Sequence, residues 1–135
     1  MEDNPTDARL VDRAFHKNQV PADLVLAADG QQAISLLFGD ASRDAMPQPK
    51  LILLDIKLPK IDGLQVLERI RSDERTALVP VVMLTSSDEM RDINKAYRLG
   101  ANSYVRKLED IDLYMEHLAN IGRYWLTANV GYSYL

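Results

Sequence analysis

The sequence predicts one α/β domain in which a parallel sheet is covered by helices on both faces. Short apolar runs alternate along the chain with amphipathic segments of helical periodicity, which is the pattern of βαβ units. The runs at 51–54 and 79–84 lack polar alternation, as is typical of strands buried on both faces. A length of 135 residues suits a single domain.

Each expected element has a local justification. Asn4 can cap a first helix that starts at Pro5 and has Asp7 near the positive end of its dipole, and Val20-Pro21 ends that helix. The later elements are expected as a short strand at 24–27, a helix over 33–37, a strand at 51–54, a helix opening at 62–63, a strand at 79–84, a helix capped at 86–89 and stopped at 100, a strand at 103–105 and a last helix over 111–125.

Composition excludes several functional classes. A net charge of -4 argues against broad electrostatic binding of nucleic acid or of an anionic membrane. The absence of Cys and the presence of only 2 His exclude thiolate and multi-histidine metal sites. No apolar run is long enough to span a bilayer, and the first residues have no signal-peptide pattern. We therefore expect a cytoplasmic protein without a nucleic-acid or membrane partner.

Polar side chains follow the expected strands at the point where each strand ends. Asp55 follows the first buried run, Thr85 follows the second and Lys107 follows the run at 103–105, while Glu2 and Asp3 precede the first helix. The carboxyl ends of parallel strands form the ligand crevice of such sheets, so these residues are expected to converge. Clustered carboxylates need a cation, and Mg²⁺ suits an incomplete cage of oxygen ligands. In this arrangement Asp55 can attack a phosphorus atom while Lys107 and the metal neutralise the developing charge.

Each of these residues also has a purely structural interpretation. Asp55 could cap a loop, Thr85 could cap a helix, and Lys107 could be an ordinary surface lysine. Glu2 and Asp3 could be a solvated acidic start. The joint pattern favours a functional site, because the residues follow buried strands in the order that the chemistry requires.

Four stretches of the chain resemble the receiver domain of two-component response regulators. They are residues 2–5 (EDNP), 53–63 (LLDIKLPKIDG), 80–87 (PVVMLTSS) and 100–107 (GANSYVRK). The likeness runs from Glu2 to about Trp125, so we expect a receiver domain at 1–127 and a C-terminal tail at 128–135. It implies a flavodoxin-like three-layer sandwich with strand order 2-1-3-4-5. The segments 102–104 and 122–126 are similar to single-domain regulators that serve phytochrome-type histidine kinases in bacteria.

The resemblance implies a magnesium-dependent phosphoacceptor. Asp55 matches the residue that receives the phosphoryl group. Asp3 matches a direct Mg²⁺ ligand, Glu2 matches a ligand that acts through water, and the backbone carbonyl of Lys57 matches the third protein ligand.

The resemblance also implies a set of switch residues. Thr85 matches the switch hydroxyl, Lys107 matches the lysine that pairs with the phosphate, and Tyr104 matches an aromatic residue that turns inward on activation. The side chain of Lys57 and Ser87 match positions that tune dephosphorylation by shielding or admitting the attacking water.

The sequence departs from this family at two places. The family has an apolar strand before the acidic pair, whereas only Met1 precedes Glu2 here. That strand is central in the order 2-1-3-4-5, so its absence leaves a gap of about twice the usual 4.7–4.9 Å strand spacing. We expect the sequence to begin at an internal Met; the alternatives are that the tail at 130–135 fills the gap as a strand, or that the chain is a nonfunctional truncated product. Leu108 stands where the family usually has Pro, so no cis peptide is expected after Lys107. The direction in which the Lys107 side chain points is therefore expected to differ from that in the family.

A signal is expected to leave this protein through protein contacts. The last helix carries an apolar stripe wider than one core-facing side requires. We therefore expect a histidine kinase as phosphoryl donor and a homodimer through the fourth and fifth helices; the alternative is that Tyr124 and Trp125 fold back onto their own domain. Two other functions stay open, a phosphorylation-independent adaptor and a small phosphatase with Asp55 as nucleophile. Lys57 stands where such phosphatases place a second Asp as acid/base, so the protein is not expected to be an enzyme.

Overall fold

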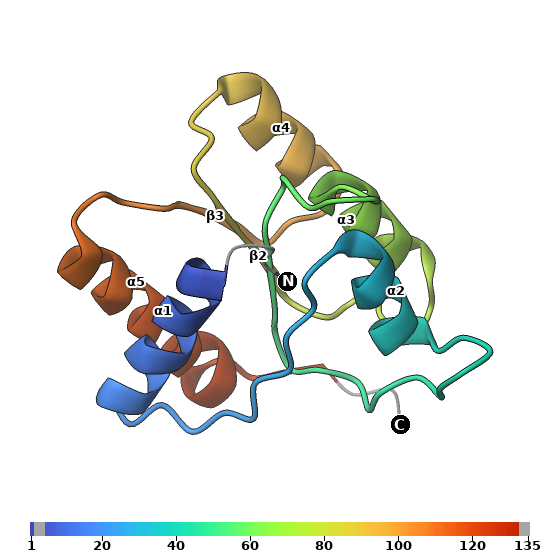
Figure 1. The fold of residues 1–135 in the computed structure, drawn as a ribbon, viewed down its shortest axis with the longest axis horizontal. Helices are drawn as coiled ribbons and strands as arrows, with labels where there is room; N and C mark the ends of the chain where they lie inside the picture. Colours follow the sequence, from blue (N-terminus) through green and yellow to red (C-terminus); the bar gives the residue numbers. More distant parts are fainter. Residues whose placement is uncertain (2–4, 133–135) are drawn as a thin grey trace.

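The computed structural model describes residue 1 and residues 5–132, which form a parallel sheet between two helical layers (Figure 1). This arrangement confirms the predicted α/β class. In chain order the elements are α1 (Pro5–Lys17), α2 (Gly30–Phe38), β1 (Ile52–Leu54), α3 (Gly63–Ser72), β2 (Val81–Thr85), α4 (Met90–Arg98), β3 (Ser103–Arg106), α5 (Ile111–Arg123) and a π-helical turn η1 (Tyr124–Ala128).

The sheet has three strands in the order β1-β2-β3, and both pairings are parallel. Ile52 pairs with Val81, and Val82 pairs with Ser103. Every residue of β2 is buried, which explains why its sequence is apolar without alternation. Because all three strands run in the same direction, their carboxyl ends lie at one edge of the sheet.

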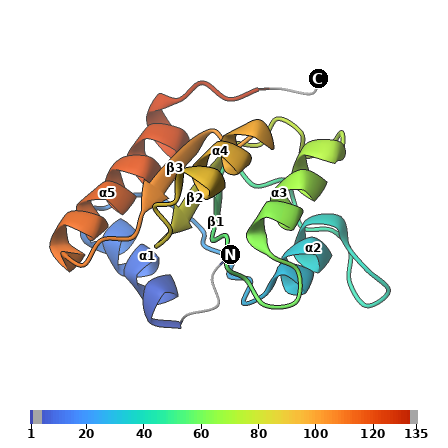
Figure 2. The same ribbon diagram turned by 90° about the horizontal axis from the view of Figure 1, so that it is seen from above.

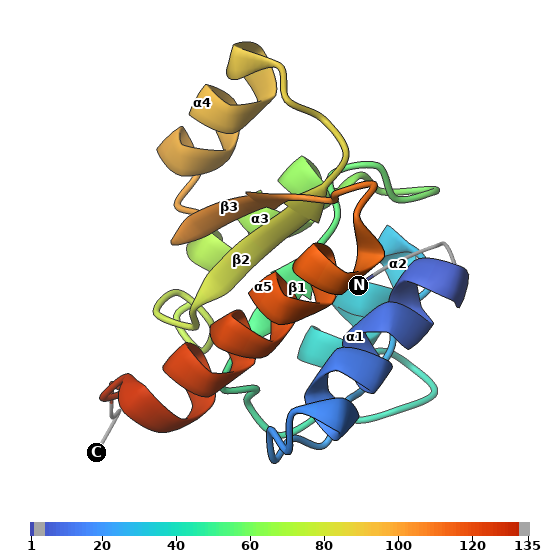
Figure 3. The ribbon, with the colours of Figure 1, turned by 90° about the vertical axis from the view of Figure 1, so that its left-hand side faces the viewer.

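Two helical layers cover the sheet. Figures 2 and 3 show α1 and α5 on one face and α2 and α3 on the other, with α4 beside α3. Successive residues of β2 point to opposite faces: Val82 and Leu84 pack with the α1–α5 layer, whereas Val81 and Met83 pack with the α2–α3–α4 layer. The strand β2 therefore anchors both hydrophobic clusters.

The prediction of a strand at 24–27 is wrong. Leu24, Val25 and Leu26 have irregular backbone and are 45%, 57% and 54% exposed. A cavity of about 930 Å³, lined by this segment, by residues 51–53 and by apolar side chains of α1 and α2, separates the segment from β1. A strand needs a hydrogen-bonded neighbour. None of the described residues supplies a strand between this segment and β1, and so the segment has no ladder to join.

Met1 occupies one position at the open edge of β1. Its α-amino group donates to Leu53 O at 2.8 Å, and its carbonyl accepts from Asp55 N–H at 3.2 Å. These two bonds are the pattern of a parallel ladder, so Met1 pairs as the last residue of a neighbouring strand would. The alternative in which the tail fills the gap gains no support from the described part of the tail: Val130 is 93% exposed and residues 130–132 form no strand, while 133–135 lie outside the described residues.

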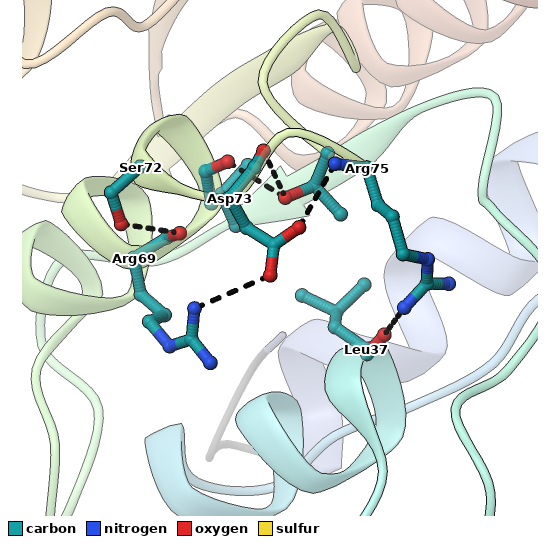
Figure 4. Close-up of polar contacts among 7 residues, drawn as sticks. Leu37, Arg69, Ser72, Asp73 and Arg75 are labelled. Atoms are coloured by element: carbon teal, nitrogen blue, oxygen red, sulfur yellow. Dashed lines mark hydrogen bonds and ion pairs between the residues drawn. The ribbon is translucent and has the colours of Figure 1, made fainter. Parts of the chain in front are cut away.

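The connection from α3 to β2 is fixed by side-chain hydrogen bonds (Figure 4). Asp73 accepts from Arg69 at 3.4 Å and from the N–H of Arg75 at 2.9 Å. The hydroxyl of Thr76 donates to a main-chain carbonyl of α3 at 2.7 Å, and Arg75 reaches Leu37 O at 3.5 Å. These contacts join the end of α3 to α2 and set where β2 begins.

We expect Gly63→Ala to destabilise the fold by about 3 kcal/mol, the upper part of the usual range for overpacking. A Cβ at Gly63 would lie 1.9 Å from Asp55 O, and rigid backbone cannot yield as a flexible side chain can. Gly131→Ala is the matched control, because a Cβ there has nothing within 4 Å. Urea unfolding of both variants measures the difference; equal stabilities would show that α3 does not approach Asp55 so closely.

Candidate functional site

The carboxyl ends of the three strands bring together three of the predicted site residues. Asp55 follows β1, Thr85 ends β2 and Lys107 follows β3. Asp55 and Thr85 are buried, and Lys107 Nζ lies 2.9 Å from Asp55 Oδ2. The side chains of this ion pair are only 15% exposed for Lys107 and 8% exposed for Asp55, so the two charges compensate each other away from bulk water.

The Asp55 carboxylate is held from both of its oxygens. Oδ1 accepts from the main-chain N–H of Lys57 at 3.1 Å, while Oδ2 contacts the Lys107 ammonium. Gly63 opens α3 directly against Asp55 O, and its N–H donates to Ile56 O at 2.7 Å. The helix and the turn after β1 therefore fix the backbone that presents this carboxylate.

Lys107 reaches the site because β3 continues its pairing past the last strand residue. Its N–H donates to Thr85 O at 2.9 Å, which places the lysine beside the end of β2. The described residues contain no cis peptide bond, so Lys107–Leu108 is trans. The lysine thus reaches Asp55 without the cis peptide that a proline would favour.

Asp7 joins this site, which the sequence analysis missed. Its Oδ2 lies 3.0 Å from Lys107 Nζ, so one ammonium bridges two carboxylates. From the sequence, Asp7 is expected only to favour the positive end of the helix dipole. No local pattern marks its contact with Lys107, because the two residues are 100 positions apart in the chain.

The loop after β2 links Thr85 to Tyr104. The Thr85 hydroxyl accepts from Ser87 N–H at 3.2 Å, and the Tyr104 hydroxyl donates to Ser87 O at 2.9 Å. The Ser87 hydroxyl donates to Asp92 of α4 at 2.7 Å. Burial raises the pKa of the Tyr104 phenol, and the Asp92 carboxylate adds to this effect. A chain of contacts therefore runs from the strand end through the loop to α4.

The metal ligands predicted from the acidic pair fall outside the described residues, since Glu2 and Asp3 are not among them. Residue 1 and residues 5–132 alone contain no group of three or more acidic, His or Cys side chains placed to hold a metal ion. What they offer is the Asp55 carboxylate with Lys57 two residues further on. A carboxylate and a peptide carbonyl are oxygen donors of the kind that Mg²⁺ prefers, so the donor chemistry fits this ion.

The arrangement suits acceptance of an anionic group. Asp55 is a carboxylate nucleophile, and the ammonium of Lys107 and the hydroxyl of Thr85 are close to it in the sheet. These groups can offset negative charge on the equatorial oxygens of a phosphoryl group. The fold and this site define the class of an α/β domain that gathers a carboxylate, an ammonium and a hydroxyl at the carboxyl ends of its parallel strands.

The chain belongs to the response regulator receiver domain family of two-component systems. Residues 1–119 match that family. The chain is 32% identical over 126 residues to response regulator Rcp1 of Synechocystis sp., covering 93% of this chain and 86% of the relative.

Two solved structures resemble the whole fold. The phosphorylated cyanobacterial phytochrome response regulator RcpA superimposes with a TM-score of 0.86 at 36% identity, covering 98% of this chain and 95% of that one. The Mn²⁺-bound form of Rcp1 gives a TM-score of 0.91 at 31% identity, covering 98% and 96%. The flavodoxin-like receiver fold predicted from the four stretches is thereby confirmed.

A search of the described helices for a membrane span finds none: each is too short or too polar to cross a bilayer.

We expect Tyr104 to make stability depend on pH above about pH 10, where an unfolded tyrosine titrates. The raised folded-state pKa means that the folded chain binds this proton more tightly. The resulting stabilisation is complete below about pH 10 and is lost as pH rises through the folded pKa. The difference in unfolding free energy between wild type and Tyr104→Phe should therefore shrink between about pH 9 and about pH 11. Urea unfolding at both pH values measures it, and a constant or growing difference would contradict the assignment.

Proposed function

We propose that this protein accepts a phosphoryl group on Asp55 from a histidine kinase and transmits the change through protein contacts. The single observation that carries the proposal is the buried Asp55 carboxylate, held 2.9 Å from Lys107 Nζ at the carboxyl edge of the sheet. A lone buried carboxylate is costly, so a site that keeps one beside an ammonium is suited to charge chemistry.

The proposed transfer is a substitution at phosphorus. An Asp55 oxygen forms a P–O bond, the P–N bond to the kinase's histidine breaks, and the imidazole nitrogen keeps the electron pair. Lys107 moves its ammonium from the carboxylate to a phosphoryl oxygen, and Thr85 donates its hydroxyl to another. The negative charge of the incoming phosphoryl group is thus compensated by the Lys107 ammonium and the Thr85 hydroxyl, which already lie at the carboxyl ends of the strands.

We propose that Asp3, Asp55 and the backbone carbonyl of Lys57 hold Mg²⁺, with Glu2 acting through water. When bound, the ion would neutralise phosphoryl oxygens that the lysine and the hydroxyl do not reach. Met1 supports this assignment, because its carbonyl accepts from Asp55 N–H, so the chain that carries Glu2 and Asp3 starts beside Asp55.

The switch is proposed to run through the loop after β2. Movement of Thr85 toward the phosphoryl group would shift Ser87, which the Tyr104 hydroxyl contacts. Tyr104 already points to this loop, so we assign it the role of stabilising the active arrangement in a two-state equilibrium. Ser87 and the exposed Lys57 side chain flank the site and are assigned to tuning water access and hence dephosphorylation.

The relatives support a phytochrome-type histidine kinase as the donor. Two structural neighbours are the phytochrome response regulator RcpA and the response regulator Rcp1, and both align over nearly the whole chain. We propose the same class of partner for this receiver unit, residues 1–127, with 128–135 as its tail.

Incubation with acetyl phosphate and Mg²⁺ should add about 80 Da per chain, the mass of one phosphoryl group. Asp55→Asn should abolish the adduct, because an amide is a far weaker nucleophile than a carboxylate. Intact-mass spectrometry measures both. Asp62→Asn is the matched control, since this exposed helix cap also lies in the connection after β1.

The same experiment separates the other functions. Absence of an adduct in a folded wild type would favour the phosphorylation-independent adaptor. Sustained release of phosphate from varied phosphate esters would favour the phosphatase.

We also propose a homodimer through α4 and α5. Large apolar side chains on these helices and at the start of η1 are exposed, namely Met90 at 64%, Tyr97 at 48%, Ile111 at 53%, Leu113 at 42% and Tyr124 at 54%. Trp125, in contrast, packs against the chain's own α1–α5 cluster, so only part of the predicted stripe folds back. The exposed part is an apolar surface of the kind that marks protein contacts.

Light scattering after size exclusion should give a dimer mass for the beryllofluoride-treated protein. Tyr97→Asp should return it to a monomer, because a charge would be buried at the interface without a partner. Gln31→Asp, at an exposed position of α2, is the control. A monomer at every protein concentration, with and without beryllofluoride, would exclude the dimer.

A further inference from the structure

Among the described residues, the Lys107 ammonium contacts the carboxylate of Asp7 as well as that of Asp55. The two ion pairs are nearly equal in length, 3.0 Å to Asp7 and 2.9 Å to Asp55. Asp7 belongs to the first turn of α1, and its side chain is 26% exposed, so it lies at the margin of the site rather than in its floor.

Lysine has a long stem with many rotamers, and its ammonium is a point charge with three donors. A lysine with Asp55 as its sole anchor would lose that anchor when the carboxylate becomes an ester-like acyl phosphate. A second carboxylate on a different element keeps the ammonium in place during that exchange. Asp7 is suited to this task, since α1 is packed against α5 and Asp7 therefore approaches Lys107 from a different element than Asp55 does.

We propose that Asp7 is a positioning residue that holds the Lys107 ammonium over Asp55 before and during phosphoryl transfer. This inference rests on the proposed phosphoacceptor function. It adds that the position of the lysine is set from α1, by a carboxylate that neither attacks phosphorus nor binds the metal.

The test is the rate of adduct formation from acetyl phosphate at saturating Mg²⁺, followed by intact mass. Asp7→Asn should slow it by about three- to tenfold, since a misplaced catalytic group loses rate steeply with distance. Asp7→Glu should restore part of the rate, because it keeps the charge. Asp12→Asn is the matched control, because Asp12 is an exposed carboxylate on the same helix.

The decisive comparison uses the Lys107→Ala background. If Asp7 acts through the lysine, Asp7→Asn should produce no further slowing there. A similar slowing in both backgrounds would mean that Asp7 acts by a route other than the lysine. A faster reaction of Asp7→Asn than of wild type would mean that the Asp7 charge mainly repels the phosphoryl donor. Either result overturns the proposal.

A second readout needs neither metal nor phosphoryl donor. In the metal-free protein, Asp7→Asn should lower the urea midpoint in the wild-type background, and should lower it less, or raise it, in the Lys107→Ala background. Equal shifts in the two backgrounds would show that the ion pair does not form. If instead wild type takes no adduct while this coupling is present, the proposed function fails and the Asp7–Lys107 pair stands.

Discussion

The compensation of the buried Asp55 carboxylate by Lys107 is the interaction on which the site depends. Removing a carboxylate from water costs several kcal/mol unless an opposite charge and hydrogen bonds replace the water, so loss of the lysine would leave the buried Asp55 carboxylate without its compensating charge. The two residues lie on opposite edges of a three-stranded sheet, on either side of β2. Their contact therefore requires the correct register of both strand pairs, and the chemistry is tied to the fold through β2.

The polar contacts around Thr85 explain how a local change can reach a surface. Thr85, Ser87 and Tyr104 form one hydrogen-bonded path from the end of β2 to β3, and Ser87 extends it to Asp92 on α4. Packed elements have discrete alternative arrangements rather than a continuum, so in the proposed switch a shift of the Thr85 hydroxyl would select between positions of the loop. The path ends on α4, which also carries the exposed Met90 and Tyr97 of the proposed dimer surface.

The polar residues at the carboxyl ends of the strands could be predicted from the sequence more reliably than the strands of the sheet themselves. Asp55, Thr85 and Lys107 could be placed because each directly follows a buried apolar run, and this rule needs only local pattern and the direction of parallel strands. The run at 24–27 has the same apolar composition but forms no strand, because strand formation depends on a partner that local pattern does not reveal. Asp7 was missed since its contact with Lys107 spans 100 residues. Periodicity also placed the last helix over 111–125 without revealing that the α-helix ends at Arg123 and continues as a π-helical turn.

Met1, at the open edge of β1, influences the backbone that presents Asp55. Leu53 O and Asp55 N–H, the groups that Met1 engages, lie on the side of β1 that faces away from β2. The backbone of Asp55 is held by Met1 on that side, by the close approach of Gly63, and by the ladder with β2 through Leu54. The Met1 side chain packs against the hydrophobic cluster on the α2–α3–α4 side of the sheet, and a close-packed interior transmits displacements between its members. The backbone of Met1 and the end of β1 are consequently coupled through two hydrogen bonds, so a displacement of Met1 would be transmitted to the backbone of Asp55.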